Sequence, residues 1–234
     1  MKKFSIILGA IILMLFVTLV IWGVYCDNTI AITNYCVNNA KNDAKLKFVV
    51  ITDLHNKEYG EKNADLAELV KEQNPDFIAV CGDMVNRGDP DTTKMKDVLE
   101  KLSKIAPTYC CLGNHERDNA AKFGTDFKSE TNSTGAVLLD NEYIKFTKNG
   151  KSVLIGGMSD YPYYEFYTPD DDVPSRTLWE EFAEKAKNNF TILLHHQPEY
   201  IAEDAKKTDI DLIVCGHTHG AVSYTHLRAH ETRG

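Results

Sequence analysis

The chain has 234 residues, of which 43% are hydrophobic and 26% are charged, and its formal net charge at pH 7 is -8. This composition favours one globular domain with a hydrophobic core and an appended segment. The negative charge argues against a general nucleic-acid-binding protein, which usually carries a basic surface, so no nucleic-acid partner is expected.

Residues 4–25 contain no charged side chain. At about 1.5 Å of rise per residue, a helix of this length extends roughly 33 Å, enough to cross the apolar core of a bilayer. Lys2 and Lys3 precede it, and the positive-inside rule places them in the cytoplasm. No small-residue cleavage site follows, so residues 1–25 are predicted to be an uncleaved transmembrane signal anchor. The protein would cross the cell membrane once, with an extracytoplasmic domain; a cleaved signal peptide is the alternative.

The first half of the domain follows a polar, asparagine-rich linker expected over residues 26–45. Apolar, β-branched segments predict three buried strands, and the segments between them carry apolar residues at helical spacing. The strands are predicted at residues 46–52, 76–81 and 107–112. The helices are predicted at residues 64–73 and 92–105, the second with Thr92 as its N-cap. Because strands and helices alternate, we expect right-handed crossovers and a largely parallel sheet.

The second half of the domain, which is expected to end at residue 221, contains shorter elements. Short strands are predicted at residues 135–139, 142–147 and 151–155, and buried strands at residues 191–194 and 211–215. Asn149-Gly150 is a strong signal for a two-residue hairpin. Helices are predicted from Pro174 to about Lys187 and near residues 199–206, and residues 156–172 are predicted to form a loop.

Residues 222–234 differ in kind from the rest of the chain. Their sequence, VSYTHLRAHETRG, resembles the translation of a transposase sequencing adapter. We therefore expect the native sequence to be represented only up to about Ala221, and we exclude the tail from the search for functional residues. The exclusion matters because His226 and His230 would otherwise be candidate metal ligands.

Two acidic motifs follow the first two predicted strands. Asp53 and His55 stand two residues apart, where alternation along an extended segment would point both side chains the same way. An Asp–His pair suits Mn, Fe or Zn. Asp83 follows Gly82, which allows a sharp turn, and its two oxygens can bridge two ions. Each motif is weak evidence alone, since Asp-x-His triplets and Gly-Asp turns are common.

A third motif, Gly113-Asn114-His115-Glu116, follows the third predicted strand. The side-chain carbonyl of Asn114 is a suitable metal ligand. His115 beside it could donate a proton to a leaving alkoxide. The alternative interpretation is an asparagine-containing turn at the start of a helix.

Histidines follow the last two predicted strands. His217 and His219 stand two residues apart between glycines, which is a strong metal-binding signal. His196 begins the loop after the preceding strand and is a candidate ligand. His195 is expected to pack at the strand end or to support the ligands.

All of these motifs stand at the carboxyl ends of predicted strands, where open α/β sheets bind their ligands. Two metal ions about 3.5–4 Å apart at such an edge can clamp a phosphoryl group. The ordered set of motifs therefore predicts a dinuclear metal centre that acts on phosphoric esters.

This motif set, over residues 47–220, resembles that of the calcineurin-like metallophosphoesterases. The resemblance implies an α/β fold, a four-layer α/β/β/α sandwich with the metal site above the central strands. It also implies further strands beyond Gly220, so the domain is expected to be truncated at its C-terminus. The implied ligands are Asp53, His55 and His219 for the first ion, Asn114, His196 and His217 for the second, and Asp83 as the bridge.

The same resemblance implies roles in catalysis. A metal-bound hydroxide would attack phosphorus, with Asp83 between the ions and His115 protonating the leaving oxygen. Asn114 would contact the substrate as well as a metal ion. Residues 82–87 are similar to a Gly-Asp-x-x-Asp-Arg segment in which Asn86 replaces the second aspartate. Arg87 would bind the substrate phosphate, or else form a surface ion pair.

The predicted function is that of a membrane-anchored phosphodiesterase with two divalent ions, Mn, Fe or Zn. The membrane-anchored members of the family imply a phosphorylated small molecule or a lipid-linked phosphate as substrate. A phosphomonoesterase or pyrophosphatase of the same fold is one alternative, and a non-catalytic, metal-stabilised surface binding module is another. His115 disfavours the binding module, which has no use for a proton donor.

Overall fold

The computed structural model describes residues 2–37, 45–158 and 174–219 of the chain. The predicted adapter tail, and most of the predicted loop over residues 156–172, lie outside the described residues. The chain divides into two compact units, Met1–Cys36 and Val37–Gly234, which are described separately.

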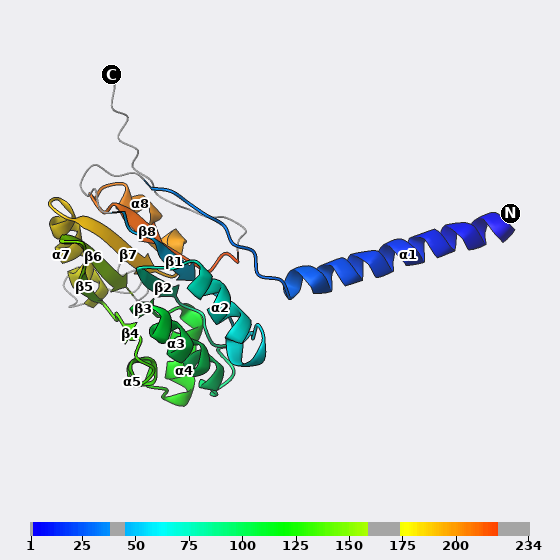
Figure 1. Ribbon diagram of the computed structural model, residues 1–234, viewed down its shortest axis with the longest axis horizontal. Helices are drawn as coiled ribbons and strands as arrows, with labels where there is room; N and C mark the ends of the chain where they lie inside the picture. The colour runs from blue at the N-terminus through cyan, green and yellow to red at the C-terminus, as the bar shows by residue number, and fades with distance from the viewer. Residues whose placement is uncertain (1, 38–44, 159–173, 220–234) are drawn as a thin grey trace, which may run out of the picture. The chain divides into compact units, whose positions relative to one another are not determined.

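The N-terminal unit contains one long helix, α1 (Lys2–Asp27), drawn in dark blue in Figure 1. Its segment Ile6–Cys26 is 21 residues long and is apolar enough to cross a membrane. Thr18 donates its hydroxyl to the Met14 carbonyl at 2.9 Å, which satisfies this polar group within the helix. Length and composition agree with the predicted anchor, although a signal sequence near an N-terminus has the same properties.

Four parallel strands form the first sheet, in the order β1-β2-β3-β4. They are β1 (Phe48–Ile51), β2 (Phe77–Cys81), β3 (Thr108–Cys111) and β4 (Val137–Leu138). The segments between them contain η1 (Glu61–Asn63), α2 (Ala64–Glu72) and α3 (Thr93–Ile105). Helices α2 and α3 lie side by side (Figure 1). The predicted alternation of strands and helices, and the parallel sheet, are confirmed.

The second sheet has the order β5-β6-β7-β8. Its strands are β5 (Glu142–Lys148), β6 (Lys151–Met158), β7 (Phe190–His195) and β8 (Leu212–Val214). The pair β5–β6 is antiparallel, and Asn149 and Gly150 between them have φ of 52° and 75°, as the predicted hairpin requires. The other pairs are parallel, with α7 (Pro174–Ala186) before β7, and η2 (Pro198–Tyr200) and α8 (Ala202–Ala205) before β8.

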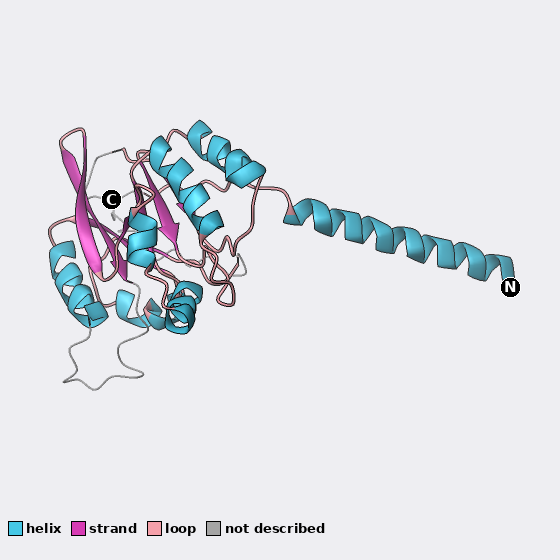
Figure 2. Cartoon of the chain, turned by 90° about the horizontal axis from the view of Figure 1, so that it is seen from below, coloured by secondary structure: helices cyan, strands magenta, loops and turns pink. Residues whose placement is uncertain are grey.

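The two sheets pack face to face. Phe77 and Cys81 of the first sheet meet Ile192 and Leu194 of the second in the core between them. On the outer face of the second sheet, Leu193 packs in a cluster with residues of α7 and α8. Helix α3 packs against β3 and α5 against β4 of the first sheet, and Figure 2 shows helices on both sides of the strands. The predicted four-layer α/β/β/α sandwich is therefore confirmed.

Two helices lie where none is predicted: α4 (Asn114–Phe123) and α5 (Phe127–Asn132). The buried residues of α4 are polar, so its sequence lacks the apolar spacing by which helices are recognised. Polar contacts define its ends instead. Glu116 accepts the Gly113 N–H at 2.8 Å, and Gly124, with a φ of 73°, ends the helix.

Thr92 occupies the N-cap position of α3, but its side chain makes no capping hydrogen bond. Its hydroxyl donates to Glu130 at 3.1 Å, while Asp91 accepts the N–H of Thr93 at 2.9 Å. A contact with α5, distant in sequence, thus outcompetes the local cap.

Three predicted boundaries also change. The strand over residues 135–139 is confined to β4, and the helix near residues 199–206 divides into η2 and α8. Residues 156–158, predicted as loop, belong to β6 and pair with β7. At Gly157 the chain needs glycine because a Cβ would lie 2.4 Å from the Leu139 carbonyl oxygen. This glycine therefore permits close packing and does not mark a turn.

Candidate metal centre

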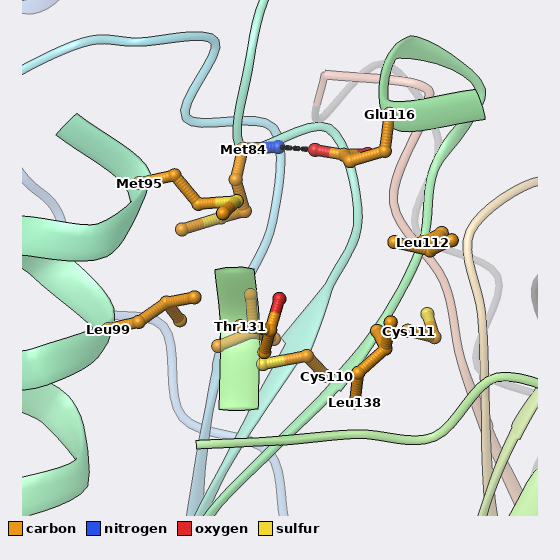
Figure 3. Close-up of a pocket in the computed structure, with 10 residues that line it drawn as sticks. Met84, Met95, Leu99, Cys110, Cys111, Leu112, Glu116, Thr131 and Leu138 are labelled. Atoms are coloured by element: carbon orange, nitrogen blue, oxygen red, sulfur yellow. Dashed lines mark hydrogen bonds between the residues drawn. The ribbon is translucent and has the colours of Figure 1, made fainter. Parts of the chain in front are cut away.

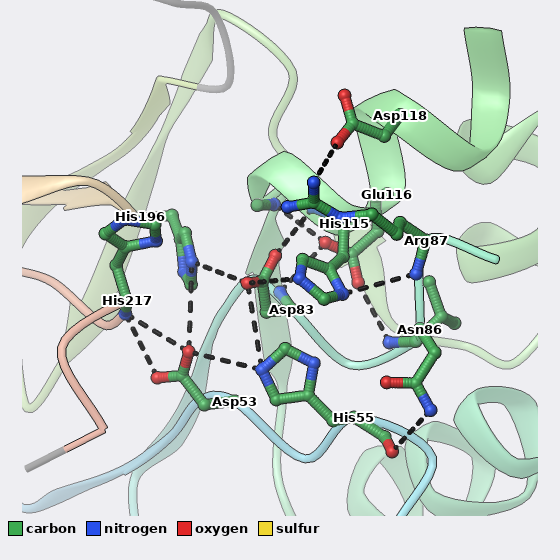
Figure 4. Close-up of polar contacts among 12 residues, drawn as sticks. Asp53, His55, Asp83, Asn86, Arg87, His115, Glu116, Asp118, His196 and His217 are labelled. Atoms are coloured by element: carbon green, nitrogen blue, oxygen red, sulfur yellow. Dashed lines mark hydrogen bonds and ion pairs between the residues drawn. The ribbon is translucent and has the colours of Figure 1, made fainter. Parts of the chain in front are cut away.

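The predicted ligands lie on loops that follow strands of both sheets. Asp53 and His55 follow β1, Asp83 follows β2, Asn114 begins α4 after β3, His196 follows β7, and His217 and His219 follow β8. Figure 4 shows side chains from both sheets converging, with Asp83 between His55 and His196. Residues up to 164 positions apart in the chain thereby come into contact.

Two groups of three side chains are each arranged to hold one metal ion. Asp53, His55 and His219 offer ligand atoms within 4.8 Å of one another, and so do Asp83, His196 and His217. Asp83 lies between the groups, because its Oδ2 is 3.8 Å from His55 Nε2 and 3.1 Å from His196 Nε2. The geometry supports the predicted ligand sets, and metal ligation itself stays a prediction.

The backbone at these residues is left-handed. Asp53, His55, Asp83, His217 and His219 have φ between 47° and 69°. Residues other than glycine rarely adopt this region, at a cost of order 1 kcal/mol or more each. The expectation that Asp53 and His55 converge because their segment is extended is therefore wrong. Their loop is fixed by hydrogen bonds from the Asp53 N–H to the Gly82 carbonyl at 3.1 Å and from the His55 N–H to the Asp83 carbonyl at 3.0 Å.

Glycine is required where two loops of the site nearly touch. A Cβ at Gly216 would lie 2.0 Å from Thr52 Oγ1, and a Cβ at Gly113 would lie 2.2 Å from Asp83 Oδ1. Both distances are far below van der Waals contact. Any side chain at these positions would therefore displace the loop that carries Asp53 or Asp83.

The first group has its carboxylate held from two sides. The His217 N–H donates to both Asp53 oxygens, at 3.2 and 3.1 Å, and the Thr52 hydroxyl donates to Oδ2 at 2.8 Å. His55 Nε2 and His219 Nε2 lie 3.2 Å apart, with their rings stacked. Two imidazole nitrogens this close, facing one carboxylate, form a donor set suited to a shared cation.

Two buried polar atoms of the predicted ligands for the second ion make no hydrogen bond, Asn114 Oδ1 and His196 Nε2. His196 Nδ1 donates to the Cys81 carbonyl at 2.7 Å, which leaves Nε2 facing Asp83. Burial disfavours a charge on His196, but Asp83 and the Cys81 carbonyl outweigh it and raise the pKa of the ring. Unsatisfied buried polar atoms are costly. A divalent ion can bind oxygen and nitrogen ligands of this kind, and it would offset the free energy that these unsatisfied atoms cost the folded protein.

Asp83 is suited to remain ionised. Burial opposes its charge, but His196 and the His115 N–H, which donates to Oδ1 at 2.8 Å, together hold the pKa of this carboxyl below its usual value. An ionised carboxylate between the two groups has lone pairs for both.

The Nδ1 atom of His115 accepts a hydrogen bond, whereas the Nδ1 atom of His196 donates one. His115 Nδ1 accepts the Arg87 N–H at 3.2 Å, so the neutral ring carries its proton on Nε2, 3.9 Å from Asp83 Oδ2. Burial lowers the pKa of His115, and the Asp83 charge opposes that shift. His115 lies near enough to His55 and Asp83 to form a third candidate metal group. A protonated Nε2 has no lone pair for a metal ion, so in this form the ring presents a hydrogen-bond donor. Donation of a proton to a leaving oxygen requires the imidazolium form of His115.

Arg87 and Asn86 flank the site. The Arg87 guanidinium pairs with Asp118 at 3.4 Å, and its side chain is 58% exposed. The structure thus shows the surface ion pair, and a contact with substrate stays a prediction. Asn86 donates its amide to the His55 carbonyl at 3.1 Å. An ionised aspartate has no donor for this bond, so the asparagine has a positioning role of its own.

Glu116 is a functional residue to which the motifs assign no role. Its side chain is 2% exposed and accepts four backbone N–H groups, those of Asp83, Met84, Val85 and Gly113. Figure 3 shows its bond to Met84 at the edge of a small, largely apolar pocket. Burial, together with the nearby Asp83 charge, raises the pKa of Glu116 in spite of these donors. Glu116 ties the Asp83 loop to the start of α4. Glu116 stands three residues after Gly113, which is the capping-box position at the start of a helix. This spacing is the feature of the sequence that could have predicted its role.

His195 supports the sheet. It is 3% exposed, and its Nδ1–H donates to the Met158 carbonyl of the neighbouring strand at 3.0 Å. Burial lowers the pKa of His195 to about 4. The ring is therefore neutral near pH 7 and packs at the strand end, as the sequence suggests.

The chain forms an α/β/β/α sandwich with two groups of aspartate and histidine at the carboxyl ends of its strands. Residues 46–221 match the family model described as calcineurin-like phosphoesterase, and the chain belongs to that family. The predicted family is confirmed.

Individual relatives are identical to this chain at about a quarter of the aligned residues. The metallophosphoesterase YkoQ of Bacillus subtilis (strain 168), which is described as uncharacterized, is 26% identical over 179 residues, 75% of this chain and 62% of YkoQ. Phosphodiesterase YaeI of Escherichia coli (strain K12) is 28% identical over 182 residues, 76% of this chain and 62% of YaeI. The chain thus spans less than two thirds of either relative.

A solved structure supports the fold. The protein TT1561 of Thermus thermophilus superposes with a TM-score of 0.54 over 73% of this chain and 81% of TT1561. Their sequence identity is 11%, so the likeness concerns the fold alone.

Replacing Glu116 with glutamine should destabilise the metal-free protein by about 2–4 kcal/mol, because the amide presents N–H groups to two of the four backbone donors. Urea unfolding of the full chain in detergent measures this change. Glu130→Gln is the matched control, since Glu130 pairs with Lys96 at the surface and should cost at most about 1 kcal/mol. Equal losses in the two variants would contradict the role given to Glu116.

The buried, neutral His195 should make stability depend on pH. Its pKa is about 4 in the folded chain and near the ordinary 6.5 when unfolded. The unfolded state therefore binds the proton first as pH falls, and about 3 kcal/mol of stability is present above pH 6.5 and lost toward pH 4. Urea unfolding across this range should show a shallower slope in His195→Gln. Identical slopes would show that His195 titrates normally in the fold.

Proposed function

We propose that this chain is a metal-dependent phosphodiesterase with a dinuclear centre. The proposal rests on the position of Asp83 between two groups of candidate ligands. It is supported by two buried atoms that could bind a metal ion and lack hydrogen bonds, Asn114 Oδ1 and His196 Nε2. Asp53, His55 and His219 would hold one ion, and Asn114, His196 and His217 the other, with Asp83 shared. Bound ions would supply Lewis acidity, activating a water molecule and neutralising charge on the phosphoryl oxygens. Mn, Fe and Zn all suit this mixture of imidazole and carboxylate ligands.

The side chains of this chain would perform the remaining steps. His115 would protonate the leaving oxygen from its imidazolium form, through Nε2, and its Nδ1 would then release the Arg87 N–H that it accepts in the neutral ring. The amide of Asn114 would help to orient the phosphoryl group. Arg87 would reach the substrate phosphate if its guanidinium exchanged Asp118 for that anion.

Two considerations support a diester as substrate. The Escherichia coli relative is named a phosphodiesterase. A diester also carries one negative charge fewer than a monoester. Asp118 near the site and the net charge of -8 on the chain would therefore repel a diester less than a monoester. A phosphomonoesterase or pyrophosphatase of the same fold is the alternative within enzymes. A binding module is disfavoured because it would have no use for His115 as a proton donor.

The apolar helix α1 supports attachment to a membrane. We propose a single-pass protein with the catalytic domain on the extracytoplasmic side, since Lys2 and Lys3 precede the span. A lipid-linked phosphate or a small phosphorylated molecule would then be its substrate.

The substrate class is tested with bis(p-nitrophenyl) phosphate and p-nitrophenyl phosphate, using the full chain in detergent with added Mn²⁺. We expect kcat/KM for the diester to exceed that for the monoester at least tenfold, and chelation of the metal to abolish both reactions. A preference for the monoester would favour the phosphomonoesterase. Metal binding without turnover of either ester would favour the binding module.

Replacing His115 with asparagine should lower kcat about 10²–10⁴-fold, because the leaving oxygen loses its proton donor. Metal content, measured by elemental analysis, should stay at the wild-type value. His55→Ala provides the contrast, since loss of a ligand should lower both metal content and turnover. The assignment of His115 fails if its variant turns over normally, or if it loses metal as His55→Ala does.

A further inference from the structure

His217 makes a contact that the ligand set does not explain. Its Nε2 lies 3.3 Å from Oε1 of Glu199, outside both groups of candidate ligands among the described residues. An imidazole has two ring nitrogens, and an Nε2 that faces a carboxylate leaves Nδ1 for a metal ion. We propose that Glu199 is a positioning residue that selects this orientation of His217 and thereby sets the affinity of the second metal site.

The loop that carries Glu199 is well placed for this role. Glu199 lies in η2, three residues after His196, and Pro198 at the start of η2 restrains the backbone between them. The Gly216 N–H donates to the His196 carbonyl at 3.0 Å, which joins this loop to the one that carries His217. One short segment therefore supplies both a ligand, His196, and the carboxylate that faces the neighbouring ligand.

The two histidines of the second group are held by different partners. His196 donates to the neutral carbonyl of Cys81, whereas His217 faces a carboxylate. A carboxylate partner makes a ligating imidazole more electron-rich and fixes its ring, and loss of such a partner commonly weakens metal binding 10–100-fold. The Glu199 side chain is 46% exposed, so it can be replaced without opening a hole in the core.

This inference rests on the proposed dinuclear centre and deepens it. Asp53, His55 and His219 have no contact with Glu199 among those described, so a loss of Glu199 should act on one site only. The protein would then keep its first ion and lose the second at low metal concentration.

The experiment compares Mn²⁺ binding by wild type, Glu199→Ala and Glu199→Gln, using isothermal titration calorimetry on the full chain in detergent. We expect two sites in wild type and a roughly 10–100-fold weaker Kd at one of them in Glu199→Ala, with a smaller change in Glu199→Gln, whose amide oxygen can still accept. Electron paramagnetic resonance should show spin-coupled Mn²⁺ pairs in wild type and isolated Mn²⁺ in Glu199→Ala at two equivalents of metal. Glu184→Ala is the matched control, since Glu184 is an exposed glutamate on α7 that pairs with Lys187, the residue that follows the helix.

The outcomes separate this inference from the proposed function. Wild-type affinities at both sites in Glu199→Ala, with unchanged circular dichroism, would overturn the role of Glu199 and leave the dinuclear centre intact. Equal weakening of both sites would also overturn it, because the effect would not be specific to His217. A wild-type protein that binds fewer than two ions would overturn the dinuclear centre itself.

Discussion

The metal centre depends on the packing of the two sheets against each other, because each sheet supplies only part of the ligands. Asp83 belongs to the first sheet and His196 to the second, yet their ligand atoms are 3.1 Å apart. The hydrogen bond from His196 to the Cys81 carbonyl crosses the same boundary. The apolar core around Phe77 and Leu194 thus holds the site together. A shift of one sheet against the other would separate the two groups.

His196 and His115 lie close together but differ in whether Nδ1 donates or accepts a hydrogen bond. His196 donates its second ring proton to a carbonyl and keeps a lone pair for a metal ion. His115, only a few ångströms from the same carboxylate, accepts an N–H at Nδ1 and keeps a proton on Nε2. Residue type and distance alone would assign both to the metal. The partner of the second nitrogen distinguishes a ring that keeps a lone pair at Nε2 from one that presents an N–H there.

The site concentrates features that cost stability when no metal ion is bound. Left-handed residues, a carboxylate without solvent at Glu116 and a buried amide oxygen without a partner at Asn114 all occur in segments that follow the carboxyl ends of strands. The four N–H groups that Glu116 accepts offset part of this cost, and they fix the loops before any metal ion arrives. The core between the sheets supplies the rest of the stability that such a site requires.

Local sequence determined the alternation of strands and helices, the hairpin at Asn149-Gly150, the apolar N-terminal helix and the residues that follow each strand. These features depend on residues close together in the chain, so periodicity and spacing reveal them. Tertiary structure decided the features that depend on distant atoms. Helix α4 is stabilised by polar contacts, Thr92 is drawn to Glu130, Arg87 pairs with Asp118, and Glu116 and Glu199 support the ligand loops. The sequence names the candidate ligands, but their left-handed backbone and their hydrogen-bond partners are set by contacts between loops that are distant in the chain.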